Sequence, residues 1–306
     1  MVSCTSISDA YHVEAQLLRT FVAVARLGSF SAAAVELGYT QAAISQQIAA
    51  LEGDLKVSLL NRRPVSPTEA GARLLEHAEA LLLRLDAARA DVTRMTQPPA
   101  ATLVVGATPL AGGSPGLALA LSALRRRRPR LDVAVRVGPR THVLTAVARG
   151  EFDVGLADGL TAPGDPLPEF APLTAVRISQ DGVVIVLPGD HPLAGRAGLR
   201  LSDLADARWI EAPDVTSPLP EIRRLAGVEG FRPAFRYDGS DSRSLLQLAA
   251  AGHGLTLLPE TALPAPGVTA VRVASPRLVH RVELVHGTLR EGSPAAELAA
   301  LLAPGG

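Results

Sequence analysis

Residues 29–71 read SFSAAAVELGYTQAAISQQIAALEGDLKVSLLNRRPVSPTEAG, and this stretch decides the fold of the first third of the chain. Its apolar residues recur three or four positions apart, which is the spacing of helices with one buried face. Ser29 or Ser31 can cap a short helix, and Gly38 can end it with a tight turn. Thr40 can then cap the next helix. The stretch therefore predicts two short helices joined by a glycine-containing turn.

The second of these helices has two chemically different faces. Its apolar face is formed by Ile44, Ile48 and Leu51. The opposite face carries small, neutral side chains, namely Gln41, Ala42, Ser45 and Gln46. Glutamine can form two hydrogen bonds with adenine, serine can bond to bases or phosphates, and alanine can touch a thymine methyl group. The face suits the major groove of DNA, but a plain helical hairpin with solvated glutamines fits the spacing equally well.

The segments on either side complete a small domain. An apolar face upstream, ending at Gly28, predicts a first helix. Downstream, Arg62 and Arg63 stand next to Pro64 in a predicted wing, where they can hold phosphates together with the capped helix N-terminus.

From Thr68 a long helix is predicted to about Met95. Its apolar positions alternate four and three residues apart, as in a coiled-coil seam. They are Leu74, Ala78, Leu81, Leu85, Ala88, Val92 and Met95. The seam predicts dimerisation through this helix, and an amphipathic helix packed on its own chain is the alternative.

After a polar break at 96–101, β-branched runs alternate with helical ones, which is typical of parallel α/β units. Strands are expected at 102–107, 131–137 and 152–157, followed by a second set of strands and helices. We expect two lobes, with the chain crossing between them near 159–164 and near 264–267.

Composition excludes several other classes of protein. The 306 residues carry no net charge, so any nucleic-acid site must be local. Cys4 is the only cysteine, and no signal peptide or membrane span is recognisable, so we expect a cytoplasmic protein without a membrane role. We expect no metal, cofactor or catalytic residues, because the seven histidines lack ligand spacing and no nucleophile motif is present. The basic run 125–128 is interpreted as a solvated helix end.

Residues 29–71 resemble the N-terminal signature of LysR-type transcriptional regulators. Three later segments, GEFDVGL, LPGDHPL and AAGHGLTLLP, are similar to parts of the LysR effector domain, which resembles periplasmic binding proteins. The resemblance covers nearly the whole chain. Within it, Ala42 stands where the family often has proline, Gln46 stands where arginine is frequent, and the wing is shorter than usual.

The resemblance implies a winged helix-turn-helix at 1–67, a linker and dimerisation helix at 68–98, and an α/β effector domain at 99–306. Lobe one is expected at about 99–160 and 268–306, and lobe two at about 161–267. The resemblance also places the four exposed residues of the second helix on base edges and Arg62, Arg63 and Thr68 along phosphates. Ser31 and Thr40 complete the expected DNA-binding set.

An effector is expected between the lobes, at strand ends and helix starts. The candidate residues are Thr108, Pro109, Arg140, Asp158, Ala212, Pro213, Ser240 and Asp241. Arg140 can clamp a carboxylate, whereas Asp158 would repel a simple anion. We therefore expect an effector that is zwitterionic, amine-bearing or uncharged, and its identity cannot be read from the sequence. A solvent-exposed role for Arg140 and a strand-end cap role for Thr108 remain open.

The expected partners are double-stranded DNA, a small-molecule effector, further copies of this chain as a dimer or tetramer, and RNA polymerase. Two alternatives remain at this stage. One is a regulator that acts without a ligand, and the other is a cytoplasmic solute-binding protein or small α/β enzyme with a helical arm.

Overall fold

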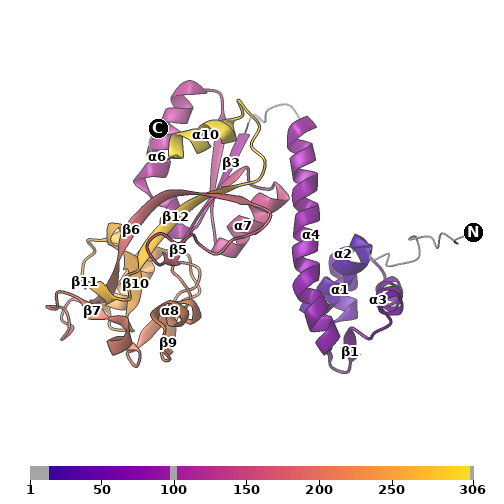
Figure 1. Ribbon diagram of the computed structural model, residues 1–306, viewed down its shortest axis with the longest axis horizontal. Coiled ribbons are helices and arrows are strands. Elements are labelled where there is room, and N and C mark those ends of the chain that lie inside the picture. Colours follow the sequence, from indigo (N-terminus) through magenta and orange to yellow (C-terminus); the bar gives the residue numbers. More distant parts are fainter. Residues whose placement is uncertain (1–13, 97–101, 304–306) are drawn as a thin grey trace, which may run out of the picture. The chain divides into compact units, whose positions relative to one another are not determined.

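Three helices and a two-stranded wing form the N-terminal unit (Figure 1). The computed structural model describes residues 14–96 and 102–303, so Cys4 and the N-terminal residues considered above lie outside it. The described chain divides into two compact units, one ending at Asp86 and one starting at Ala87. The elements of the first unit are α1 (Ala15–Leu27), α2 (Phe30–Leu37), α3 (Gln41–Leu55), β1 (Leu60–Arg62), β2 (Val65–Pro67) and, up to Asp86, the first part of α4 (Glu69–Thr96).

The helix ends of this unit follow the sequence signals. Gly28 and Gly38 end α1 and α2 in the left-handed conformation, with φ of 60° and 72°. The side chains of Ser29 and Thr40 cap α2 and α3 by accepting hydrogen bonds from backbone amides. Phe21, Val24, Ile44, Ile48 and Leu51 meet in the core. The predicted winged helix-turn-helix is confirmed.

The long helix is α4 (Glu69–Thr96), 28 residues without a break. Its first turn passes so close to the wing that a Cβ atom at Gly71 would lie 2.0 Å from the carbonyl oxygen of Leu59. Glycine is therefore required where the wing leads into the helix.

Lobe one of the second unit is a sheet in the order β4-β3-β5-β12-β6. Helices α6 and α10 pack against each other and share one apolar core with the sheet, and α7 contributes to a second core. The elements are β3 (Thr102–Ala107), α5 (Pro109–Gly112), α6 (Pro115–Arg127), β4 (Asp132–Val137), α7 (Arg140–Arg149), β5 (Val154–Thr161), β6 (Thr174–Pro188), β12 (Val279–His286) and α10 (Pro294–Leu302).

Lobe two is built on the second half of β6, where β10 and β11 pair with it. Trp209, fully buried, packs against Phe231 with 5.1 Å between ring centroids. The elements are β7 (Leu199–Arg200), the 3-10 helix η2 (Leu201–Leu204), β8 (Trp209–Glu211), α8 (Leu219–Ala226), β9 (Pro233–Arg236), α9 (Ser242–Ala250), β10 (Thr256–Pro259), the 3-10 helix η3 (Glu260–Ala262) and β11 (Val268–Ser275).

The chain crosses between the lobes at places other than those predicted. Strand β6 pairs with β12 up to Gly182 and with β10 from Val183 onward, so one crossing lies inside a single strand. The other lies between Ser275 and Val279, at the end of β11. Residues 268–275, expected in lobe one, pair in lobe two. Residues 159–161 are the end of β5 within lobe one, and the turns at 163–164 and 266–267 are not crossings. An extended strand can pass from lobe to lobe without any turn.

Candidate functional site

The face of α3 opposite its core residues is largely exposed among the described residues. Gln41, Ala42 and Gln46 are exposed and Ser45 is half-buried. The side-chain oxygen of Thr40 accepts a 3.1 Å hydrogen bond from the amide of Ala43, which fixes the start of the helix. Short polar groups are therefore presented on a rigid, capped helix whose first amides remain available to an acceptor.

Gln47 has a different role from its neighbour Gln46. The hydroxyl of Thr20, which is fully buried, donates a 2.5 Å hydrogen bond to Oε1 of Gln47. This contact ties α3 to α1. The side chain of Gln47 is therefore part of the scaffold, a distinction that composition and spacing did not reveal.

In the wing, the two arginines differ in how much they are already held. The guanidinium of Arg62 lies 5.0 Å from the centroid of the Phe30 ring and 3.3 Å from Oε2 of Glu52. Arg63 is exposed and forms no ion pair within the part of the chain that the structure describes. Arg63 is thus the freer of the two cations.

Two of the expected DNA-binding residues have local structural roles. The Ser31 hydroxyl lies 3.0 Å from that of Ser29, and Ser29 provides the cap of α2. The Thr68 hydroxyl donates to the carbonyl of Ser58 at 2.8 Å and accepts from the amide of Gly71 at 3.0 Å. The Thr68 side chain therefore joins the wing to the start of α4.

The seam of α4 changes character along its length. Leu74 packs against the winged core, and Ala78 is buried. Further along, Leu81, Val92 and Met95 are 56%, 60% and 71% exposed. Ala88 is also exposed, and Leu85 is half-buried. From Leu81 onward the seam presents apolar surface that its own chain leaves uncovered.

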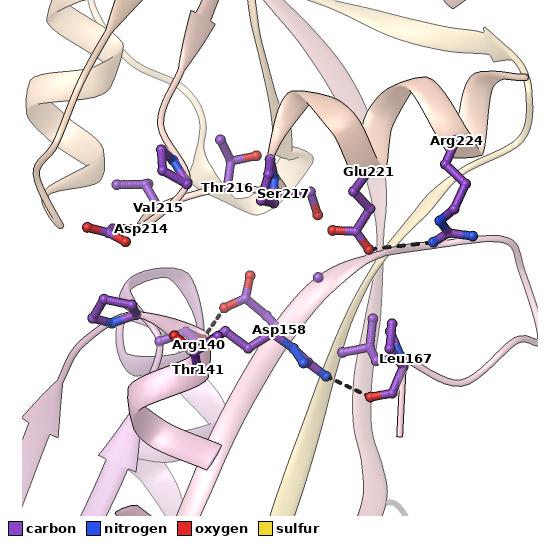
Figure 2. Close-up of a pocket in the computed structure, with 16 residues that line it drawn as sticks. Arg140, Thr141, Asp158, Leu167, Asp214, Val215, Thr216, Ser217, Glu221 and Arg224 are labelled. Atoms are coloured by element: carbon purple, nitrogen blue, oxygen red, sulfur yellow. Dashed lines mark hydrogen bonds and ion pairs between the residues drawn. The ribbon is translucent and has the colours of Figure 1, made fainter. Parts of the chain in front are cut away.

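A cavity of about 500 Å³ lies between the lobes of the second unit. Figure 2 shows its labelled side chains in two facing rows, with Asp214 to Arg224 on one side and Arg140, Thr141 and Asp158 on the other. The lining residues are Thr108, Pro139, Arg140, Thr141, Asp158, Gly159, Leu167, Pro168, Pro213, Asp214, Val215, Thr216, Ser217, Pro218, Glu221 and Arg224.

Four of the eight expected cleft residues lie outside this lining. Pro109 begins the short helix α5, and Ala212 is almost fully buried. Asp241 caps α9, because its carboxylate accepts from the amide and the hydroxyl of Ser244 at 2.8 and 2.7 Å. These hydrogen bonds lower the pKa of Asp241. Ser240, directly before it, is exposed. The other four, Thr108, Arg140, Asp158 and Pro213, line the cavity.

Asp158 is the centre of a buried polar cluster. One carboxylate oxygen accepts from the hydroxyl of Thr108, and the other lies 2.7 Å from Nε2 of His280 on β12. All three side chains are buried. Asp158, which was expected to face the effector and repel an anion, is thus hydrogen-bonded within lobe one.

Arg140 begins α7 and is only partly satisfied. Its guanidinium donates to the carbonyl of Pro168 at 3.3 Å (Figure 2). Burial lowers the pKa of Arg140, and the negative charges of Glu283, Glu221 and Asp158 act in the opposite direction. The group remains a cation with donors to spare.

The second-lobe wall, residues 213–221, contains side chains that sequence reasoning missed. The hydroxyl of Ser217 accepts from the amide of Leu160 at 3.1 Å, and that of Thr216 donates to the carbonyl of Leu257 at 2.9 Å. Both partners are more than forty residues away in sequence. No local pattern identifies such residues, because the contacts exist only after the lobes have formed.

The basic run at the end of α6 and the expectations about metals and membranes can also be compared with the structure. At the end of α6, Arg128 forms hydrogen bonds of 3.0 and 2.6 Å with the carboxylate of Glu297 on α10. Over residues 14–96 and 102–303, no cluster of His, Cys, Asp and Glu could hold a metal ion. The same residues contain no helix that is long and apolar enough to span a membrane.

A winged helix-turn-helix joined by a long helix to a two-lobed domain with a cavity defines a ligand-responsive DNA-binding regulator. Residues 15–72 match the family described as bacterial regulatory helix-turn-helix protein, lysR family, and residues 96–302 match the LysR substrate binding domain. The chain belongs to the LysR family of transcriptional regulators.

Three comparisons place the chain within this family. It is 32% identical to a probable hydrogen peroxide-inducible genes activator of Mycobacterium avium, over 88% of this chain and 86% of that protein. Among solved structures, a hydrogen-peroxide-bound OxyR variant of Corynebacterium glutamicum is 28% identical, with a TM-score of 0.53 and coverage of 95% and 94%. Full-length CbnR in complex with its target DNA is 25% identical, with a TM-score of 0.51 and coverage of 95% and 98%.

Proposed function

We propose that this regulator binds its effector in the inter-lobe cavity and that occupancy changes how it holds DNA. The observation that supports this most is the cavity of about 500 Å³ with Arg140 and Asp158 on one wall and residues 213–221 on the other. A ligand that touches both walls favours one lobe arrangement over another. Such coupling is typically worth about 1–3 kcal/mol.

For the DNA contact, we propose that Gln41, Ala42, Ser45 and Gln46 read base edges, while Arg63 and the capped start of α3 hold phosphates. These side chains are exposed or half-buried, and Arg63 has no ion pair among the described residues. Arg62 is expected to contribute less, because it already stacks on Phe30 and pairs with Glu52.

The exposed part of the α4 seam is proposed as the dimerisation surface, since uncovered apolar side chains at heptad spacing favour a partner helix. A double substitution Leu81→Glu and Val92→Glu should convert the protein to monomers in analytical ultracentrifugation. Ala80→Glu, at an exposed position off the seam, should leave the oligomer intact. A double variant that stays oligomeric would place the interface elsewhere.

The protein is further proposed to have no catalytic activity and to work in the cytoplasm, where a bacterial regulator meets its DNA. Support for the first point is the side-chain chemistry of the cavity. The Ser217 hydroxyl accepts from the Leu160 amide, and the Thr108 hydroxyl bonds to a carboxylate, Asp158, that is buried and held by His280, so both hydroxyl groups serve as fixed parts of the wall.

Some relatives carry hydrogen peroxide in their names, but we do not propose that this protein senses peroxide through a cysteine. The sequence has one cysteine, Cys4, and two methionines, Met1 and Met95. Residues 97–306 therefore contain no sulfur atom, and the thiol oxidation chemistry of a cysteine sensor has no group to act on there. A reversibly bound small molecule is the signal that this domain can receive.

The test is DNase protection of the intergenic DNA upstream of the gene, with and without a small-molecule extract of the host cell. Specific protection should be lost in a Gln41→Ala, Ser45→Ala double variant. The extract should alter protection by the wild type but not by Thr141→Trp, which fills the cavity from an exposed lining position. Ser122→Trp, exposed on α6 away from the cavity, is the control and should respond normally. An extract that acts equally on Thr141→Trp would contradict the proposal.

A further inference from the structure

The polar groups around the cavity divide into those that are held by hydrogen bonds inside the protein and charged groups that are mostly unpaired. Thr108 and Asp158 bond to each other, and Asp158 also to His280. The Thr216 hydroxyl donates to a backbone carbonyl and the Ser217 hydroxyl accepts from a backbone amide of other segments. These residues build the walls. The charge of a bound molecule has to be recognised by the charged groups that remain.

Arg140 is the first of these free groups. Its guanidinium can donate five hydrogen bonds, and in the described chain it donates one, to the carbonyl of Pro168. Among residues 14–96 and 102–303, no carboxylate lies within 4 Å of it, whereas several other arginines of the domain have one. A guanidinium of this kind, half-buried in a cavity wall, matches the two oxygens of a carboxylate.

Asp214 is the second, and it comes from the opposite lobe (Figure 2). Its side chain is half-buried and has neither a hydrogen bond nor an ion pair within the described residues. The neighbouring carboxylate of Glu221 lies 3.8 Å from the guanidinium of Arg224 and is thereby partly neutralised. Asp214 is therefore the carboxylate left to receive a cation.

The balance of charge narrows the choice among effectors. Three carboxylates, those of Asp158, Asp214 and Glu221, share the lining with two guanidinium groups, those of Arg140 and Arg224. An acid without an amine would add negative charge to this set, and an amine alone would leave Arg140 unpaired. An uncharged molecule would cover both free groups without a charged partner, which is costly.

We infer that the effector is a zwitterion, with a carboxylate bound by Arg140 and an ammonium group bound by Asp214. This rests on the proposed function, because it concerns the same cavity. Much of the remaining lining is apolar, including Pro139, Leu167 and Val215. The cavity therefore fits a small amino acid or amino acid derivative with an apolar body.

The inference is tested with matched triads on the full-length protein, read by calorimetry and by thermal unfolding. Each triad comprises a standard amino acid, the acid that lacks its amino group and the amine that lacks its carboxylate. At least one amino acid should bind about tenfold or more tightly than the acid and the amine of its triad. It should also raise the melting temperature of the protein, as a ligand of the native state does.

Two isosteric variants then assign the contacts. Arg140→Gln should weaken that amino acid by about 30-fold or more and leave the matched amine unchanged. Asp214→Asn should weaken it similarly and leave the matched acid unchanged. Arg236→Gln, at an exposed arginine of lobe two that pairs with Asp238 and lies outside the cavity lining, is the control and should change affinity less than about threefold.

The outcomes separate this inference from the function on which it rests. Binding of an acid or an amine as tightly as its amino acid would overturn the zwitterion and leave the effector cavity standing. The absence of binding by every triad would also overturn it. If the host extract in addition failed to alter DNA protection by the wild type, the effector function itself would be contradicted.

Discussion

The DNA-facing helix and the inter-lobe cavity use their polar side chains in opposite ways. On α3, the side chains of Gln41 and Gln46 are exposed and form no hydrogen bond within the described residues, whereas Gln47 accepts from the buried Thr20 hydroxyl. Around the cavity the reverse holds, because Asp158 and Ser217 are engaged in buried contacts. Helix α3 thus presents several polar side chains without a protein partner, whereas the inter-lobe cavity presents few.

This difference follows from what each surface has to recognise. Base edges in a groove are met by a convex helix, which can leave its polar groups solvated until DNA arrives. Polar groups that are buried in a cavity wall must be satisfied by the protein itself, and the groups left without a protein partner select the ligand. A serine can therefore be available to DNA on α3, as Ser45 is, and be part of the scaffold in the cavity wall, as Ser217 is.

The largest expected effect tests the structural role of the cavity carboxylate. Asp158→Ala leaves the buried Thr108 hydroxyl and His280 ring without their partner, and it should destabilise the protein by roughly 3 kcal/mol. Asp214→Ala, in the same cavity but without a partner among the described residues, should change stability by less than about 0.5 kcal/mol. Urea unfolding measures the free energy of unfolding of both variants. Equal losses would mean that Asp158 is no more structural than Asp214.

The next effect is on DNA binding. Gln41→Ala should weaken binding to the protected site by about 2 kcal/mol if Gln41 makes a two-bond contact to a base, without a measurable loss of stability. Fluorescence anisotropy with specific and scrambled duplexes gives the value. Equal weakening on both duplexes would mean that Gln41 does not read sequence.

A smaller effect separates the two adjacent glutamines. Gln47→Ala should cost about 1 kcal/mol of stability, because the buried Thr20 hydroxyl loses its acceptor. Gln46→Ala, one position earlier and exposed, should not. Thermal unfolding of both variants decides the matter, and a stability loss confined to Gln46→Ala would reverse the assignment.

The smallest expected effect on stability comes from the ion pair of Arg128 and Glu297. This pair lies outside both α3 and the cavity, so it shows how much an ordinary polar contact contributes. The hydrogen bonds from Arg128 lower the pKa of Glu297 below its unfolded value. Glu297 therefore stabilises the native state above its unfolded pKa of about 4.3, and this contribution is lost as the pH falls through the lower folded value. Glu297→Gln should be slightly less stable than wild type at pH 7, with the difference disappearing once the pH is low enough to protonate Glu297 in the folded state. A difference that grows in acid would contradict the sign.

The sequence predicted these elements unequally well. The helices of the winged unit follow from signals a few residues apart, such as Thr40 before Gln41, and they formed as expected. Thr108 and Arg140 could be placed near a cavity because they follow a strand end or begin a helix, whereas Asp158, predicted to follow the third strand, lies inside β5 and still lines the cavity. Asp214, Ser217 and His280 could not, because their positions depend on partners far away in sequence. The crossing inside β6 was missed, since a strand that changes lobes has no turn signal.

Strand β6 also limits how the molecule can be taken apart. The winged unit is one uninterrupted piece of chain up to Asp86, so a single junction is enough to graft it onto another effector domain. Lobe two shares β6 with lobe one, and its exchange would need two junctions, one in the middle of a paired strand. Recombination between relatives can thus easily combine a new operator with an old signal, whereas the two halves of the cavity have to change together.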